Sequence, residues 1–240
     1  AARHRRDSRG RPGGHRRSTR PVLSTEQLSG PPALHYLVAG RRFTVHPAGF
    51  WQTHPAAAEV FTETVLRAAV PRQGVRVLDL YAGSGLFTAA LASAVTGTGR
   101  VLGLEADPTA VADAGANLAD QPWAGVRRAT VTAQAVEAAA AELSTDAGRL
   151  DIVVLDPPRS GAGREVLTAI LAAQPRVVVY VACDPSALAR DVRIAMDAGW
   201  RLDELSAFDA FPMTHHVECI AVLHPEPGQD AYENSTAQVG

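Results

Sequence analysis

The sequence predicts an α/β fold in which a doubly wound sheet is covered by helices on both faces. Two continuous apolar runs, IVVL at 152–155 and VVVYV at 177–181, are typical of strands that are buried on both sides. Segments with strand-like and helix-like patterns also alternate along most of the chain, as they do in repeated βαβ units. In such sheets ligands bind at the carboxyl ends of the strands, so functional residues are expected there.

The regular pattern begins near residue 33 with a predicted β-hairpin. Its strands are LHYLVAG at 34–40 and RRFTVH at 41–46, and the turn falls at Ala39-Gly40-Arg41. Residues 55–70 follow with apolar side chains at helical spacing, and Pro55 suits the start of a helix. The hairpin is therefore an extension that precedes the main sheet.

The alternating part of the chain supplies the sheet and its covering helices. Strands are expected over 75–82, 100–106, 127–134, 150–158 and 176–183. Helices are expected over 85–94, 108–119, 135–143, 163–173 and 185–198. A last pair of strands is expected over 201–211 and 216–224.

Composition is that of an ordinary soluble domain. The chain has 240 residues, of which 46% are hydrophobic and 20% charged, so one main domain is expected. No apolar run is long enough to span a membrane, and no signal peptide is recognised. The two cysteines, Cys183 and Cys219, and the scattered histidines show neither a disulfide framework nor metal-ligand spacing. We therefore expect a cytoplasmic monomer without a metal site.

The two ends of the chain differ from the middle. Residues 1–32 are rich in arginine, glycine and proline without apolar periodicity, which predicts a disordered tail. Eight arginines and one acid lie in residues 1–20, although the whole chain has a net charge of −2. This segment is either a phosphate-binding arm or a solvated tail. Residues 225–240 are polar and predict a flexible tail.

A glycine-rich turn in VLDLYAGSGLFT, residues 77–88, follows the first strand of the main sheet. Gly83 and Gly85 allow a ligand to approach the backbone at a helix start. Glu105 ends the next strand twenty residues later and is placed to accept hydrogen bonds from a ribose. Thr88 stands where the dinucleotide fingerprint has its third glycine, which disfavours NAD.

The remaining adenosyl cofactors are nucleoside triphosphates and S-adenosylmethionine. The sequence has no G-x-x-x-x-G-K-[ST], which disfavours a P-loop. Asp79, at the head of the turn, suits a sulfonium cation better than a pyrophosphate. S-adenosylmethionine is therefore the favoured cofactor.

Three further polar side chains lie at or near strand ends. Asp156 in VLDPPRSG is held by two prolines, and Arg159 replaces the aromatic residue of an amino-group methyltransferase loop. Cys183 ends the next strand against a helix start, where Asp184 opposes the effect of the helix dipole on the thiol. Glu218 lies inside an apolar strand, where a carboxylate needs a partner or a cleft. Cys183 and Glu218 together offer a nucleophile and a base.

Five segments in order resemble the RNA uridine-C5 methyltransferases, which make 5-methyluridine in tRNA or ribosomal RNA. They are FWQTH at 50–54, DLYAGSGLFT at 79–88, LDPPRSG at 155–161, YVACDPSALARD at 180–191 and FPMTHHVEC at 211–219. The resemblance covers residues 33–224. It implies a seven-stranded, Rossmann-like class I methyltransferase sheet over 55–224, with 33–54 as a remnant of the family's central domain.

The resemblance also implies roles for individual residues. Cys183 is implied as the nucleophile that adds to C6 of uracil, and Glu218 as the acceptor of the C5 proton. The implied contacts to S-adenosylmethionine are Gln52, Tyr81, Glu105 and Asp156, beside the backbone of Gly83 and Gly85. The implied partner is RNA, and the target uridine must leave its stack to reach both groups.

The chain departs from the family pattern at three positions. Ala182 and Asp184 replace the serine and asparagine that usually flank the cysteine, and Leu86 replaces a frequent asparagine. The extra cysteines that hold an iron–sulfur cluster in some relatives are missing, so no cluster is expected in this chain. Two alternatives stay open: a methyltransferase of another substrate, such as RNA cytosine C5 or a small molecule, and a non-catalytic RNA-binding fragment.

Overall fold

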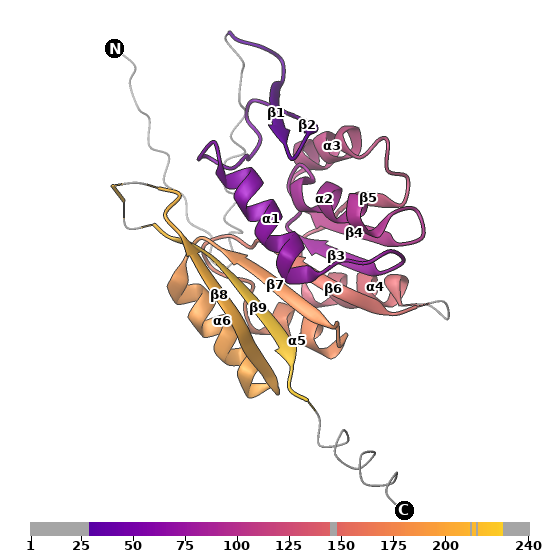
Figure 1. Ribbon diagram of the computed structural model, residues 1–240, viewed down its shortest axis with the longest axis vertical. Coiled ribbons are helices and arrows are strands. Elements are labelled where there is room, and N and C mark those ends of the chain that lie inside the picture. Colours follow the sequence, from indigo (N-terminus) through magenta and orange to yellow (C-terminus); the bar gives the residue numbers. More distant parts are fainter. Residues whose placement is uncertain (1–28, 145–147, 212, 215, 228–240) are drawn as a thin grey trace, which may run out of the picture. The chain divides into compact units, whose positions relative to one another are not determined.

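The computed structural model describes residues 29–144, 148–211, 213–214 and 216–227. Most of the predicted arginine-rich tail and of the predicted C-terminal tail therefore lie outside the described residues. The main feature is a seven-stranded sheet of order β5-β4-β3-β6-β7-β9-β8 (Figure 1). Its strands are β3 (Arg76–Leu80), β4 (Arg100–Glu105), β5 (Ala124–Arg128), β6 (Leu150–Leu155), β7 (Val177–Ala182), β8 (Trp200–Phe208) and β9 (Glu218–Pro225).

The doubly wound α/β class and the N-terminal hairpin are confirmed. Five strands, β5 to β7 in the sheet order, are parallel, while β9 runs antiparallel to both β7 and β8. The hairpin pairs β1 (Leu34–Val38) with β2 (Arg41–Val45) as a separate two-stranded sheet. Parallel strands bring their carboxyl ends to one edge, so β3, β4, β6 and β7 deliver their C-terminal residues to a common site.

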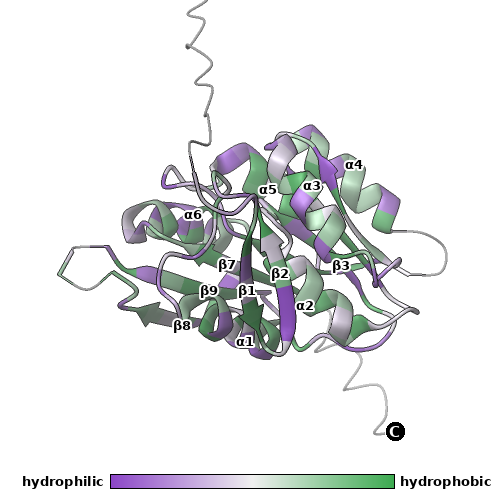
Figure 2. Ribbon diagram, turned by 90° about the horizontal axis from the view of Figure 1, so that it is seen from above, coloured by the Kyte–Doolittle hydropathy of each residue, from purple (hydrophilic) through white to green (hydrophobic). Residues whose placement is uncertain are grey.

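Helices cover both faces of the sheet, as the uninterrupted apolar strands require. One core cluster joins the sheet to the hairpin, to α1 (Ala57–Ala69) and α2 (Leu86–Val95), and to Leu118, which caps α3 (Pro108–Asn117). The other joins it to α4 (Ala133–Leu143), α5 (Arg164–Ala172) and α6 (Pro185–Asp197). In Figure 2 the central strands β7 and β9 are mainly hydrophobic. Within the described residues, no helix is both long and apolar enough to cross a membrane.

One predicted strand was misplaced. The pattern RRATVTAQ predicted a strand over 127–134, whereas β5 ends at Arg128. Thr132 instead caps α4, because its side chain accepts a hydrogen bond from the Ala135 N–H at 3.2 Å. The short strand pairs Val126 with Gly103 of β4, which has no side chain to compete for the space. Alternating Thr and Val residues after Arg128 therefore belong to a capping loop.

Two helices begin with the same Asp-Pro pair. Asp107 caps α3 by accepting from the Thr109 and Ala110 N–H groups at 2.8 and 2.9 Å. Asp184 caps α6 by accepting from the Ala187 N–H at 2.7 Å. In each case proline occupies the first turn, where its missing N–H costs nothing. The cap fixes the point at which each helix leaves the carboxyl edge of the sheet.

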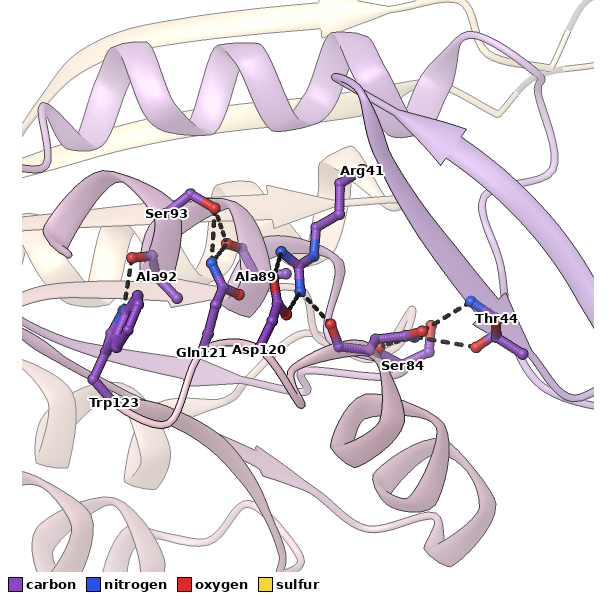
Figure 3. A network of polar contacts seen from close by, with 10 residues as sticks. Arg41, Thr44, Ser84, Ala89, Ala92, Ser93, Asp120, Gln121 and Trp123 are labelled. Atoms are coloured by element: carbon purple, nitrogen blue, oxygen red, sulfur yellow. Dashed lines mark hydrogen bonds and ion pairs between the residues drawn. The ribbon is translucent and has the colours of Figure 1, made fainter. Parts of the chain in front are cut away.

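Asn117, at the end of α3, joins the hairpin to the glycine turn. Its side chain accepts from the Thr44 N–H (2.8 Å) and donates to the carbonyls of Thr44 (3.1 Å) and Ser84 (3.0 Å). Beside it, Arg41 pairs with Asp120 and donates to the Asn117 carbonyl (Figure 3). This cluster, which we name the Asn117 clasp, fixes β2 against α3 and against the turn between β3 and α2.

We predict that Asn117→Ala lowers the free energy of unfolding by about 2 kcal/mol, since it leaves three backbone groups without their partner. Asp120→Ala is the control, because that carboxylate is 69% exposed and its ion pair contributes less than about 1 kcal/mol. Urea unfolding followed by circular dichroism measures both. Equal losses for the two variants would contradict a structural role for the Asn117 side chain.

Candidate active site

The glycine turn lies at the centre of the carboxyl edge. Gly83 and Gly85 have φ values of 54° and 87°, a region that favours glycine. A Cβ on Gly83 would meet nothing within 4 Å, so the space above this residue is open to a ligand. A Cβ on Gly85 would lie 3.3 Å from that of Ala114, so Gly85 also lets α3 approach the start of α2.

Glu105 binds the glycine turn directly. Its Oε2 accepts from the Gly83 N–H at 2.9 Å, and its Oε1 accepts from the Asp107 N–H at 2.8 Å. A carboxylate oxygen has two acceptor positions, so each oxygen retains one for a further donor. The carboxylate is therefore fixed by the protein and still able to receive two ligand hydroxyls.

Asp79, at the head of the glycine turn, is buried rather than exposed to solvent. Its side chain is 1% exposed, and its Oδ2 accepts from the Thr88 hydroxyl at 2.5 Å. Among the described residues, its Oδ1 has no hydrogen-bond partner. Burial, together with the charge of Glu105, raises the pKa of Asp79 to about 7, although the Thr88 bond opposes this.

The bond between Asp79 and Thr88 also explains why α2 lacks the third glycine of a dinucleotide site. A Cβ on Gly103, which pairs with Asp79 across β4 and β3, would lie 3.2 Å from the Thr88 hydroxyl oxygen. The space for Thr88 therefore comes from a glycine on the neighbouring strand. In the sequence, only the position of Gly103 inside an apolar strand could have indicated this arrangement.

Asp156 lies just beyond β6, next to the glycine turn. Its N–H donates to the Leu80 carbonyl at 3.2 Å, which ties the Asp-Pro-Pro loop to the end of β3. Burial and the nearby charges of Glu218 and Asp79 raise the pKa of Asp156 to about 8. A cation bound beside these carboxyls would favour their ionised form and so lower their pKa values.

Cys183 and Glu218 come from neighbouring antiparallel strands. Ala182 of β7 pairs with Cys219 of β9, so one further step in the register places Cys183 opposite Glu218. Directly opposed residues have their Cβ atoms about 4.5–5.5 Å apart on the same face of a sheet. Cys183 is partly exposed, whereas Glu218 is 7% exposed. The predicted alternation of β9, with Glu218, Ile220 and Val222 on one face, is confirmed.

The pKa values of this pair are both raised. For the Cys183 thiol the main cause is burial, followed by the charges of Glu218 and Asp156, while Arg159 opposes the shift. Burial also raises the pKa of Glu218, again against Arg159. The Asp184 side chain, whose effect on the thiol was left open by the sequence, points to the Ala187 N–H as the helix cap.

Arg159 is the functional candidate that the sequence analysis missed. In the sequence it was noted only because it replaces an aromatic residue. Its positive charge lowers the pKa values of both the Cys183 thiol and the Glu218 carboxylate. Its guanidinium lies 3.4 Å from Nε2 of His216, which precedes β9. The sequence signal for Arg159 is the DPPR segment, because two prolines stiffen the loop and restrict where the following arginine can lie.

The other predicted cofactor residues are less closely joined to this site. Tyr81 has a φ of 63° in the glycine turn, and burial and the charge of Asp191 raise its pKa. Gln52 follows Trp51, whose ring stacks on Tyr36 of the hairpin at 4.5 Å. The stacking of Trp51 on Tyr36 positions the backbone next to Gln52. Among the described contacts, none holds the Gln52 side-chain amide. In the described part of the chain, no group of three or more His, Cys, Asp or Glu could hold a metal ion.

Comparisons with known proteins give a family match and several similar chains. Residues 35–225 match the family model described as tRNA (uracil-5-)-methyltransferase. An uncharacterized RNA methyltransferase of Streptomyces avermitilis is 45% identical over 186 residues, covering 78% of this chain and 41% of the relative. A second, from Streptomyces coelicolor, is 42% identical over 199 residues, covering 83% and 42%. The chain thus spans about four tenths of the length of these relatives.

Among solved structures, the tRNA (uracil-54, C5)-methyltransferase of Pyrococcus abyssi in complex with S-adenosyl-L-homocysteine superimposes with a TM-score of 0.64. It is 28% identical, and the match covers 81% of this chain and 45% of that one. TrmN from Thermus thermophilus has a TM-score of 0.55 at 22% identity, over 69% of this chain and 48% of that one, and shows the fold alone. The seven-stranded sheet is that of the class I methyltransferases.

We predict that the reactivity of Cys183 depends on the charges around it. Glu218→Gln removes a negative charge, lowers the thiol pKa and speeds alkylation by iodoacetamide at pH 8; Arg159→Gln removes a positive charge and slows it. Mass spectrometry of the Cys183 peptide measures the rates, with the wild-type chain alkylated under the same conditions as the reference. Equal rates in both variants would show that these charges do not act on the thiol.

Proposed function

This chain belongs to the tRNA (uracil-5-)-methyltransferase family, and we propose that it methylates C5 of a uridine in tRNA or ribosomal RNA. The observation that carries the proposal is the β7–β9 register, which places a thiol opposite a buried carboxylate at the edge that also holds the glycine turn. Because the chain spans less than half of its relatives, we propose residues 55–224 as the catalytic domain and 33–54 as part of a larger central domain. A monomeric state and a cytoplasmic location remain predictions.

S-adenosylmethionine, when bound, supplies an electrophilic methyl group on a sulfonium cation. The proposed contacts are the backbone of Gly83 and Gly85, and the carboxylates of Glu105 and Asp156, with Gln52 and Tyr81 beside them. The observations that support this fit are the open space above Gly83, the free acceptor positions on Glu105 and the unpaired buried Oδ1 of Asp79. The acids favour a cation over a pyrophosphate.

The proposed chemistry uses Cys183 as the nucleophile. C5 of uracil reacts poorly by itself, so the Cys183 thiolate adds to C6, and the electron pair of the C5–C6 bond becomes available at C5. C5 then takes the methyl group while the bond from that methyl to sulfur breaks. The Glu218 carboxylate removes the C5 proton, the C5–C6 double bond forms again, and the thiolate leaves.

The raised pKa of Cys183 sets a requirement on this reaction. Only the thiolate attacks, and in the free protein burial and two carboxylates disfavour it. The Arg159 guanidinium lowers the thiol pKa, and a cationic ligand near Asp156 neutralises part of the opposing charge. We therefore propose that Arg159 supports the Cys183 thiolate through its charge.

We predict that RNA containing 5-fluorouridine forms a covalent adduct at Cys183 in the presence of S-adenosylmethionine, because fluorine cannot leave as a proton. Cys183→Ser forms none. Glu218→Gln forms an adduct with unmodified RNA and releases it at least about 100-fold more slowly, since the base is missing. Denaturing gels and peptide mass spectrometry measure these products; turnover of Glu218→Gln at the wild-type rate would exclude Glu218 as the base.

We also predict that cofactor binding at pH 7 releases protons. The sulfonium cation lowers the pKa values of Asp79 and Asp156, which are about 7 and about 8 in the free protein, so both groups become more ionised. Calorimetry in buffers of different ionisation enthalpy measures the release, and S-adenosyl-L-homocysteine, with its neutral thioether, is the matched control. Equal proton release for the two ligands would contradict the proposed placement of the sulfonium.

A further inference from the structure

A concave surface lies on the other side of the loop that carries Asp156 and Arg159. It encloses about 600 Å³ between residues 160–164 and α6. Three arginines line it, Arg164 from the start of α5 and Arg190 and Arg193 from α6, and Asp197 is the acidic residue among its lining. We name it the arginine hollow.

Arg190 is held in a fixed position within the hollow. Its Nε and Nη2 donate to Oδ1 of Asp191 at 3.0 and 2.8 Å, and Nη2 also donates to the Ser160 carbonyl at 2.7 Å. Asp191 is fully buried, where its Oδ2 accepts from the Tyr180 hydroxyl at 2.8 Å and the Ala162 N–H at 2.9 Å. These bonds use Nε and Nη2, so Nη1 is the part of the guanidinium that is left for a ligand.

The described residues carry a net negative charge, and the arginines of the hollow differ from this average. The described residues hold fifteen arginines and twenty aspartates and glutamates, so a polyanion is repelled by the domain as a whole. Four of those arginines, Arg159, Arg164, Arg190 and Arg193, lie on the loop after β6, at the start of α5 and on α6. Asp191 pairs with Arg190 and Asp197 pairs with Arg193, so this side offers a phosphate a cluster of guanidinium N–H donors rather than a net positive charge.

The hollow shares its loop and its helix with the proposed active site. The loop after β6 presents Asp156 and Arg159 to the site and Ser160 to the hollow, while α6 begins two residues after Cys183. A nucleotide whose base reaches Cys183 must continue its backbone away from the sheet edge, and α6 leads from Cys183 to the hollow. Guanidinium groups bind phosphate in a planar, bidentate geometry.

We propose that the arginine hollow binds a backbone phosphate of the substrate RNA next to the target uridine. This inference rests on the proposed function, because it assumes that the polyanion on this face is the RNA that delivers the uridine. Arg190 is the fixed contact, whereas Arg164 and the largely exposed Arg193 (76% exposed) adjust to the strand.

The test compares two double variants of the full chain that lose the same charge. Arg164→Gln with Arg193→Gln changes the hollow and leaves Arg190 and Asp191 intact. The control, Arg72→Gln with Arg149→Gln, changes exposed arginines that precede β3 and β6, at the opposite ends of the strands. Fluorescence anisotropy gives the Kd for a uridine-containing RNA stem-loop over a range of KCl concentrations.

We predict that the hollow variant binds the RNA about tenfold more weakly at 0.1 M salt, and that its salt slope falls by about 0.7 for one lost single-strand phosphate contact. The control changes Kd by less than about twofold. The affinity for S-adenosyl-L-homocysteine and the thermal unfolding temperature, which do not depend on RNA, stay unchanged in both variants.

The outcomes separate the two proposals. If the hollow variant keeps wild-type Kd and salt slope, or the control loses as much, the hollow is not the RNA contact even when the 5-fluorouridine adduct still forms. If no adduct forms at Cys183 in the wild-type chain but RNA binding still depends on Arg164 and Arg193, the reaction is wrong and the hollow stands. If wild-type chain binds no RNA at any salt concentration, both are overturned.

Discussion

The antiparallel pairing of β9 with β7 is the constraint on which the site depends. Residues 182 and 219 are paired, so Cys183 and Glu218 are brought together although 35 positions separate them in the chain. A parallel strand at this position would present its opposite end, and the carboxylate would lie at the far edge of the sheet. The other strands then contribute by ending at the same edge, where they add the glycine turn, Glu105 and Asp156. Shifting β9 by one residue would turn Glu218 to the other face, toward α4, α5 and α6.

The acidic groups around Cys183 and Glu218 are only partly offset by the positive charge of Arg159. Burial raises the pKa values of Asp79, Asp156, Cys183 and Glu218, and neighbouring acids add to the shift for the first three, so in the free protein these carboxylates hold protons more tightly than usual. Arg159 is the described cation that opposes the shift at both the thiol and Glu218. Such a site is matched to a positively charged ligand and is unfavourable for a second anion. RNA phosphates therefore need a different surface, and the arginines of α6 and of the start of α5 offer one.

Much of this fold could be predicted from the sequence because its signals are local. Apolar runs mark β6 and β7, and Asp-Pro pairs mark the starts of α3 and α6. The strand predicted at 127–134 failed because Thr132 acts through a cap, which local alternation does not distinguish from a strand. The role of Asn117 depends on Thr44 and Ser84, which lie 73 and 33 residues away in the chain, so no pattern near it reveals the contacts. Arg159 was visible, but its effect on Cys183 and Glu218 depends on how the loop after β6, the end of β7 and the start of β9 lie in space.

The Asn117 clasp has a consequence for how the two parts of the molecule respond to each other. One side chain bonds both to Thr44 in the hairpin and to Ser84 in the glycine turn. Any ligand that orders the turn also favours the docked hairpin, and any load on the hairpin weakens the turn by the same free energy, because coupling between two sites is reciprocal. The same coupling free energy should therefore appear in cofactor affinity when the hairpin is changed and in hairpin docking when the cofactor is bound.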